Sequence, residues 1–178
     1  MEPTVGQLLT PSQAMRLAIR QGTKGVGYVS PNPLVGCTIV DREHRLLAVG
    51  HHAMVGGDHA EVAALKKLKS PEDLGGCHVY VSLEPCAHQG RTPSCAMTLA
   101  LLKPASITYA VEDPNPLVAG RGAAILREAG IRVDLLANRT DIADRAALTF
   151  PDRFAAQDLP GAVWLLLKLR AAQRWQRA

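Results

Sequence analysis

The chain has 178 residues, 47% hydrophobic and 20% charged, which is typical of one soluble globular domain and excludes a disordered or fibrous chain. Its formal net charge of +4 lies entirely in residues 168–178, and the neutral remainder argues against a protein that follows a nucleic-acid backbone. No secretory signal precedes residue 22, and the apolar run at 162–167 is far below the ~20 residues that span a bilayer, so we expect a cytoplasmic protein without a membrane segment.

Helices and strands alternate along the predicted elements. The first helix is expected from Ser12, its predicted N-cap, to Gly22, and a rigid Pro-Asn-Pro loop follows at residues 31–33. The other predicted elements are strands over 34–40 and 46–52 joined by a polar turn, a helix over 59–69, a strand over 78–83, a helix over 94–102, a strand over 107–111, a helix over 119–129 closed by Gly130, a strand over 131–136 and a helix over 141–148. This alternation predicts an α/β layered sheet.

Three residues at predicted helix starts are of types that bind metals. His59 lies at the start of one helix, and Cys86 and Cys95 lie near the start of the next. One imidazole and two thiolates leave a fourth position for water, as in a catalytic rather than a structural zinc site. The partial positive charge of helix N-termini favours the thiolate form. We therefore predict a Zn²⁺ site at these residues, whereas Cys37 and Cys77 have no partner motif and are predicted to be structural.

Glu61 follows His59 by two residues and is the predicted catalytic residue. Zinc lowers the pKa of bound water towards ~7, so a neighbouring carboxylate can take the proton and pass protons to a ring nitrogen and to departing ammonia. Taken singly, each residue is better explained by packing, or by the preference for an acid in a first helical turn. Their joint occurrence at strand-to-helix junctions favours catalysis.

A wider pattern runs through four segments: residues 30–36, 57–62, 83–95 and 113–122. The order His-x-Glu, Pro-Cys, Cys is the signature of zinc deaminases acting on cytosine- and adenine-like rings. From about Met15 to Val133 the chain resembles the deaminase domain of the bacterial riboflavin-biosynthesis deaminase/reductase, in the cytidine-deaminase superfamily. The resemblance implies a three-layer α/β/α cytidine-deaminase-like fold with a central mixed sheet of about five strands.

The resemblance also implies a substrate and its binding residues. The reaction would be the hydrolytic deamination of 2,5-diamino-6-(5-phosphoribosylamino)pyrimidin-4(3H)-one, a phosphorylated pyrimidine nucleotide, in riboflavin biosynthesis. By this resemblance, six residues bind the ring, ribose and phosphate: Asn32, His52, His88, Arg91, Asp113 and Asn115. A fixed cation suits a phosphate, and rigid loops suit amide hydrogen bonding. Equally, Arg91 could be a solvated charge and each asparagine an Asx turn.

The chain departs from the family pattern in three places. Asp58 and Ser94 stand where the family often has proline, and Asp58 brings an extra carboxylate next to His59. The family also continues into a reductase domain. Residues 1–150 are expected to form the deaminase domain, and residues 151–178 a tail, the remnant of the linker and start of a missing reductase domain. A separate reductase would then perform the next step, and we expect a homodimer that covers exposed apolar surface.

Two other functions stay open from the sequence. A deaminase of another pyrimidine would carry the same metal site, whereas an editor of nucleic-acid bases is disfavoured by the 4% aromatic content, since such enzymes need stacking residues. A catalytically lapsed paralogue could instead act as a binding module.

Overall fold

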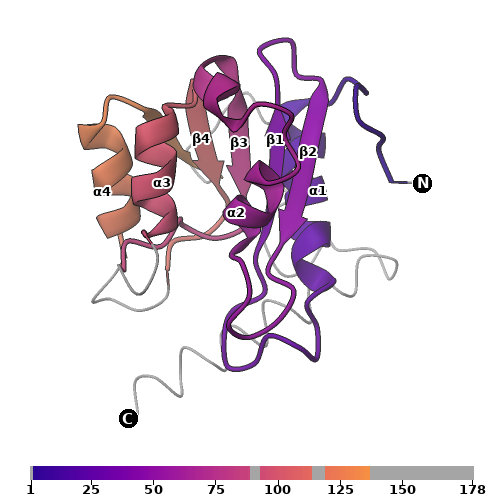
Figure 1. The fold of residues 1–178 in the computed structure, drawn as a ribbon, viewed down its shortest axis with the longest axis vertical. Coiled ribbons are helices and arrows are strands. Elements are labelled where there is room, and N and C mark those ends of the chain that lie inside the picture. The colour runs from indigo at the N-terminus through magenta and orange to yellow at the C-terminus, as the bar shows by residue number, and fades with distance from the viewer. Residues whose placement is uncertain (1, 89–92, 114–118, 137–178) are drawn as a thin grey trace.

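The computed structural model of the chain describes residues 2–88, 93–113 and 119–136, which form one mixed sheet flanked by helices (Figure 1). The strand order is β2-β1-β3-β4-β5. β1 pairs antiparallel with β2 and β3, whereas β4 pairs parallel with β3 and β5. The strands are β1 (Gly36–Val40), β2 (Leu46–His51), β3 (His78–Val81), β4 (Ser106–Tyr109) and β5 (Arg132–Leu135).

Helices cover both faces of the sheet. α1 packs against β1, β2 and β3 on one face, whereas α2 packs against β1 and β2 on the other, and α3 and α4 pack together beside it (Figure 1). The helices are α1 (Pro11–Thr23), α2 (Ala60–Leu65), α3 (Cys95–Leu102) and α4 (Arg121–Glu128). The three-layer α/β/α fold and its mixed sheet of five strands are therefore confirmed.

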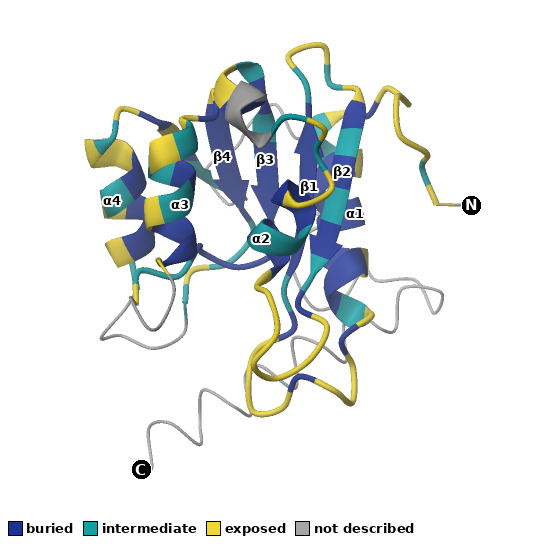
Figure 2. Ribbon diagram, in the orientation of Figure 1, coloured by how far each residue is buried: buried dark blue, intermediate teal, exposed yellow. Residues whose placement is uncertain are grey.

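Each face of the sheet buries its own apolar cluster, and the strands are accordingly the most buried part of the fold (Figure 2). Successive side chains of a strand point to opposite faces. Val79 and Val81 therefore join the cluster under α2, α3 and α4, while Tyr80 joins the cluster under α1. A fully buried aliphatic side chain contributes about 1.5–3 kcal/mol, so these clusters hold the helices on the sheet.

The start of α1 differs from the prediction. Thr10, and not Ser12, is the N-cap: its Oγ1 accepts the backbone N–H of Gln13 at 3.2 Å, and the Gln13 side chain accepts the N–H of Thr10 at 2.8 Å. Pro11 then occupies the first helical position, where its fixed φ suits the helix and no N–H partner is needed. The reciprocal capping box decides the boundary, and the prediction at Ser12 was wrong.

The other predicted strands and helices within the described residues are present with shifted ends. The helix predicted over 59–69 is α-helical only over α2, and a 3-10 helix at Pro71–Gly76 was not predicted because it has no apolar periodicity. Gly130 has a φ of +80° and closes α4 as expected. The helix expected at 141–148 and the boundary at residue 150 lie outside the described residues. No described helix has the length and apolar character needed to cross a membrane.

Candidate metal and catalytic site

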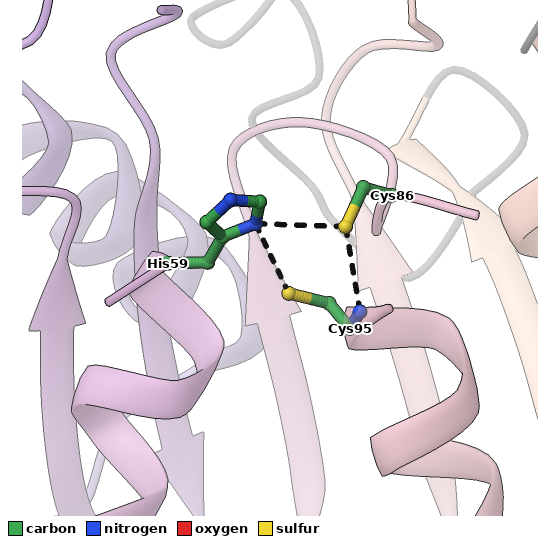
Figure 3. A group of neighbouring side chains, drawn as sticks. All are labelled: His59, Cys86 and Cys95. Atoms are coloured by element: carbon green, nitrogen blue, oxygen red, sulfur yellow. Dashed lines mark hydrogen bonds between the residues drawn. The ribbon is translucent and has the colours of Figure 1, made fainter. Parts of the chain in front are cut away.

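Three side chains from separate elements meet near the N-termini of α2 and α3 (Figure 3). His59 is the N-cap of α2, Cys86 lies on the segment after β3, and Cys95 is the first residue of α3. The side chain of His59 makes no capping hydrogen bond, and its ring points to the two sulfurs instead. The Nδ1 and Sγ atoms all lie within 4.8 Å of one another. The fold therefore brings together the three residues predicted to bind metal.

The spacing of these atoms suits a zinc ion. The Nδ1 atom of His59 lies 3.5 Å from Sγ of Cys86 and 3.4 Å from Sγ of Cys95. Tetrahedral zinc with its usual bond lengths to nitrogen and sulfur places these two kinds of ligand about 3.5 Å apart. Among the described residues, no other three or more His, Cys, Asp or Glu side chains form such a group. Donor chemistry and distances thus both fit zinc.

Hydrogen bonds within the group favour a thiolate at Cys86. The Cys95 thiol and then the His59 ring donate to the Cys86 sulfur and lower the pKa of Cys86, and the backbone N–H of Cys95 donates to it at 3.4 Å. The same contact with Cys86, followed by burial, raises the pKa of Cys95, and the hydrogen bond that the His59 ring donates to the Cys86 sulfur raises the pKa of His59. Cys86 therefore ionises first, and a bound metal would deprotonate Cys95 as well.

Glu61 lies beside the three-residue group without belonging to it. Its side chain is only 4% exposed, and burial raises its pKa to about 7. Its carboxylate also interacts with the Cys95 sulfur, which lowers the pKa of Glu61 slightly against the effect of burial. A buried carboxyl group with a pKa near 7 can take and return a proton at neutral pH. Glu61 thus lies next to the metal-binding group, and its role in proton transfer stays a prediction.

His52 links a predicted substrate residue to the metal-binding group. Its Nδ1 donates to the carbonyl oxygen of Asp58 at 2.9 Å, so its Nε2 accepts the Nδ2–H of Asn32 at 3.1 Å. The ring also lies edge-on to the ring of His59, with 5.6 Å between centroids. His52 is 4% exposed with both ring nitrogens bonded to protein, whereas Asn32 is exposed. The structure therefore brings Asn32 and His52 together, with the ring of His52 against that of His59.

The structure describes two of the other four predicted substrate residues. His88 is exposed on the segment that follows Cys86, and Asp113 is half-buried on the segment that follows β4. Arg91 and Asn115 lie outside the described residues.

Asp58 and Ser94, which stand where the family often has proline, each make a defined contact in this fold. The carboxylate of Asp58 accepts from Nζ of Lys66 at 2.6 Å and is absent from the metal-binding group. The extra carboxylate that was expected beside the metal therefore serves an ion pair. Ser94 is the N-cap of α3, where its Oγ accepts the backbone N–H of Met97 at 3.2 Å. This cap fixes Cys95 at the first position of the helix.

Comparison with known proteins places the chain in a family. Residues 10–111 match the family model described as the cytidine and deoxycytidylate deaminase zinc-binding region. The chain belongs to the cytidine and deoxycytidylate deaminase family. The matched region of this deaminase-family chain includes His59, Glu61, Cys86 and Cys95.

This deaminase-family chain is similar to riboflavin biosynthesis proteins. The protein RibD of Actinobacillus pleuropneumoniae is 47% identical over 125 residues, 70% of this chain and 32% of that protein. The structure of Acinetobacter baumannii RibD is 43% identical with a TM-score of 0.66, over 76% of this chain and 36% of that one. The Thermotoga maritima diaminohydroxyphosphoribosylaminopyrimidine deaminase/5-amino-6-(5-phosphoribosylamino)uracil reductase is 35% identical with a TM-score of 0.65. That match covers 77% of this chain and 38% of the Thermotoga maritima chain. The chain thus spans about a third of the length of these relatives.

One buried carboxylate of this deaminase-family chain near the site was not predicted. The carboxylate of Glu84, two residues before Cys86, is 4% exposed and accepts backbone N–H groups of Asp113, Gly120 and Ala123. Glutamate is rarely so buried without partners. Its position between Leu83 and Pro85, both apolar, was the available signal. Its partners lie 29 to 39 residues further along the chain, where no local pattern points to them.

Proposed function

We propose that the chain is a zinc-dependent hydrolase acting on a cyclic amidine C–N bond, which converts 2,5-diamino-6-(5-phosphoribosylamino)pyrimidin-4(3H)-one to 5-amino-6-(5-phosphoribosylamino)uracil and ammonia in riboflavin biosynthesis. The observation that carries the proposal is the meeting of His59, Cys86 and Cys95 beside the buried carboxylate of Glu61. The choice of substrate is supported by the similarity to the Thermotoga maritima protein, whose name includes this deaminase activity.

His59, Cys86 and Cys95 would hold the zinc ion through Nδ1 and the two Sγ atoms. When bound, zinc would acidify a water molecule so that its oxygen can be supplied to the ring carbon near neutral pH. The reaction breaks the exocyclic C–N bond, places oxygen on that carbon and releases ammonia, so protons must reach the ring nitrogen and the leaving amino group. Glu61 would hold and move these protons, because its carboxylate contacts Cys95 and lies outside the ligand group.

The substrate would bind along the exposed edge of the site. Asn32 is exposed, and the bond from its Nδ2 to His52 orients its amide so that Oδ1 can accept an N–H of the pyrimidine ring. His88, which is exposed on the segment after Cys86, and Asp113, which is half-buried on the segment after β4, would make further polar contacts with the substrate. We assign the phosphate to Arg91, whose guanidinium suits a phosphate geometrically, and a further amide contact to Asn115.

Domain organisation and assembly form a second part of the proposal. Residues 1–150 would make up the deaminase domain, and residues 151–178 would correspond to the linker and the start of a reductase domain. A reductase would act on the product in the next step, as the names of the similar bifunctional proteins suggest. We also propose a cytoplasmic homodimer, since Tyr28, Met54 and Val55 expose apolar side chains. Sedimentation at micromolar concentration tests this assembly, because a species of 19.0 kDa would contradict it.

The reaction is tested by measuring ammonia release from zinc-loaded protein. The diaminopyrimidine nucleotide is the test substrate, and deoxycytidine monophosphate is the matched control for another pyrimidine. The proposal expects ammonia from the first and little from the second. Ammonia only from deoxycytidine monophosphate would indicate a different pyrimidine deaminase. Zinc-loaded protein that yields no ammonia from either would contradict the enzyme and favour a binding module.

A further inference from the structure

Glu84 occupies a place in the fold that the proposed chemistry does not use. It is a buried carboxylate two residues before Cys86, one of the residues of the metal-binding group. Its Oε2 accepts the backbone N–H of Gly120 at 2.9 Å and of Asp113 at 3.3 Å, and its Oε1 accepts that of Ala123 at 3.1 Å. A charged group is seldom buried unless hydrogen bonds satisfy it, and here three backbone donors do so.

Two of the three donors to Glu84, the N–H groups of Gly120 and Ala123, belong to the N-terminus of α4, which has no capping side chain of its own. The N-cap, Gly120, has no side chain, and the first turn of α4 contains no acidic residue. Unpaired N–H groups and the helix dipole make such an end favourable for an anion. Glu84 supplies that anion from the segment after β3, so one carboxylate binds this segment to α4.

Backbone contacts around Glu84 make this attachment tight. The Cβ of an alanine at Gly122 would lie 1.9 Å from the carbonyl oxygen of Pro85, so the helix and the segment are in direct contact. The N–H of Glu84 donates to the carbonyl of Val111 at 2.9 Å. On the other side, the carbonyl of Cys86 accepts the N–H of Ala96 in α3 at 3.1 Å. The backbone at Cys86 is thus held between α4 and α3.

We infer that Glu84 is the positioning residue for Cys86: by joining the segment after β3 to the N-terminus of α4, it holds the Cys86 sulfur at the distance from His59 and Cys95 that a metal ion requires. This inference rests on the proposed metal site and adds a residue outside the ligand group. It assigns Glu84 no contact with the metal or with the substrate.

The test measures zinc affinity and not turnover. In Glu84→Gln the side chain keeps its size, but its NH₂ group would face backbone donors that need an acceptor. Zinc affinity, measured by competition with a chromogenic chelator, should fall about 10–100-fold, the range for residues that support metal ligands. The absorption from thiolate to Co²⁺ in cobalt-loaded protein should weaken or shift. Gly122→Ala should change both readouts in the same direction, because it displaces the carbonyl of Pro85 without removing a charge.

Two control variants separate positioning from general loss of stability. Glu112→Gln removes an exposed carboxylate at the same edge of the sheet and should leave zinc affinity unchanged. Ile19→Val loosens the cluster under α1, on the opposite face, and should lower the melting temperature without changing the cobalt spectrum. A folded Glu84→Gln protein with wild-type zinc affinity and spectrum would overturn the inference. The inference would also be overturned if Ile19→Val lowered the melting temperature as much as Glu84→Gln does and lost as much zinc affinity.

A measurement on the wild-type chain covers the case in which Glu84→Gln does not fold. The amide protons of Gly120 and Ala123 should exchange more slowly when zinc is added, because the metal and Glu84 hold the same segment. Unchanged exchange would overturn the inference. Wild-type protein that binds no zinc would overturn both the metal site and the role of Glu84, whereas zinc binding without ammonia release would overturn only the proposed reaction.

Discussion

The Nδ1 atom of His52 donates a hydrogen bond of 2.9 Å to the carbonyl oxygen of Asp58, the residue directly before His59. The proton must lie on Nδ1, because a carbonyl oxygen only accepts. The Nε2 atom is then the acceptor for the amide of Asn32. One buried ring therefore connects the backbone next to a proposed metal ligand with a proposed substrate residue, and its two nitrogens can be tested separately.

Two substitutions at His52 should have different effects. His52→Asn retains a donor near the position of Nδ1 and loses the acceptor for Asn32, so KM for the nucleotide should rise while zinc affinity stays constant. His52→Gln retains an acceptor near the position of Nε2 and loses the bond to Asp58, so zinc affinity should fall. Each effect should be about 2–10-fold, the value of one net hydrogen bond. Equal changes of KM and zinc affinity in both variants would contradict separate roles for the two nitrogens.

Removal of either metal-binding thiol should abolish stoichiometric zinc. Cys86→Ser and Cys95→Ser replace a thiolate with a hydroxyl group that is a poor zinc ligand, so the zinc content should drop from one ion per chain to a small fraction. Cys77→Ser is the matched control, because Cys77 is buried outside the group and should keep full zinc. Metal analysis after dialysis gives the result. Full zinc in Cys86→Ser would show that Cys86 is not a ligand.

Zinc should also stabilise the fold. A ligand at a thousand times its dissociation constant that binds only the folded state adds about 4 kcal/mol to the free energy of unfolding. For a chain of this size that corresponds to a rise of about 8–16 °C in melting temperature. Mg²⁺ at the same concentration should have no effect, since thiolate and imidazole ligands suit zinc far better. Scanning calorimetry with and without a chelator tests this, and identical melting curves would argue against a metal site in the folded chain.

Local sequence patterns predicted the metal-binding residues better than they predicted the order of the strands in the sheet. His59 and Cys95 could be found because each stands at a helix start, which is marked by a cap and by the onset of periodicity, and Cys86 because it follows proline shortly before the second of these helices. The hairpin of β1 and β2 could be predicted from its polar turn. The full strand order could not, since it depends on packing between segments far apart in the chain.

The contacts that the sequence did not predict join residues distant in sequence. Glu84 was not predicted, because its partners Gly120 and Ala123 lie more than thirty residues away. His52 was expected to contact the substrate, and the buried positions of both its ring nitrogens emerge only when the segments around Asn32 and Asp58 are placed side by side. Side-chain partners across a fold have no periodic signal in the sequence.

The central claim, that Glu61 moves protons in a zinc-dependent deamination, is tested most directly by measuring zinc content and ammonia release together in wild type and Glu61→Gln. The amide can form hydrogen bonds but cannot accept and return a proton. Ammonia release should therefore fall by about 10²–10⁴-fold. Zinc should stay at one ion per chain, because Glu61 lies outside the ligand group, and Glu43→Gln, an exposed control, should retain both. Retained ammonia release in Glu61→Gln would remove Glu61 from the mechanism, and loss of zinc would make it a ligand instead.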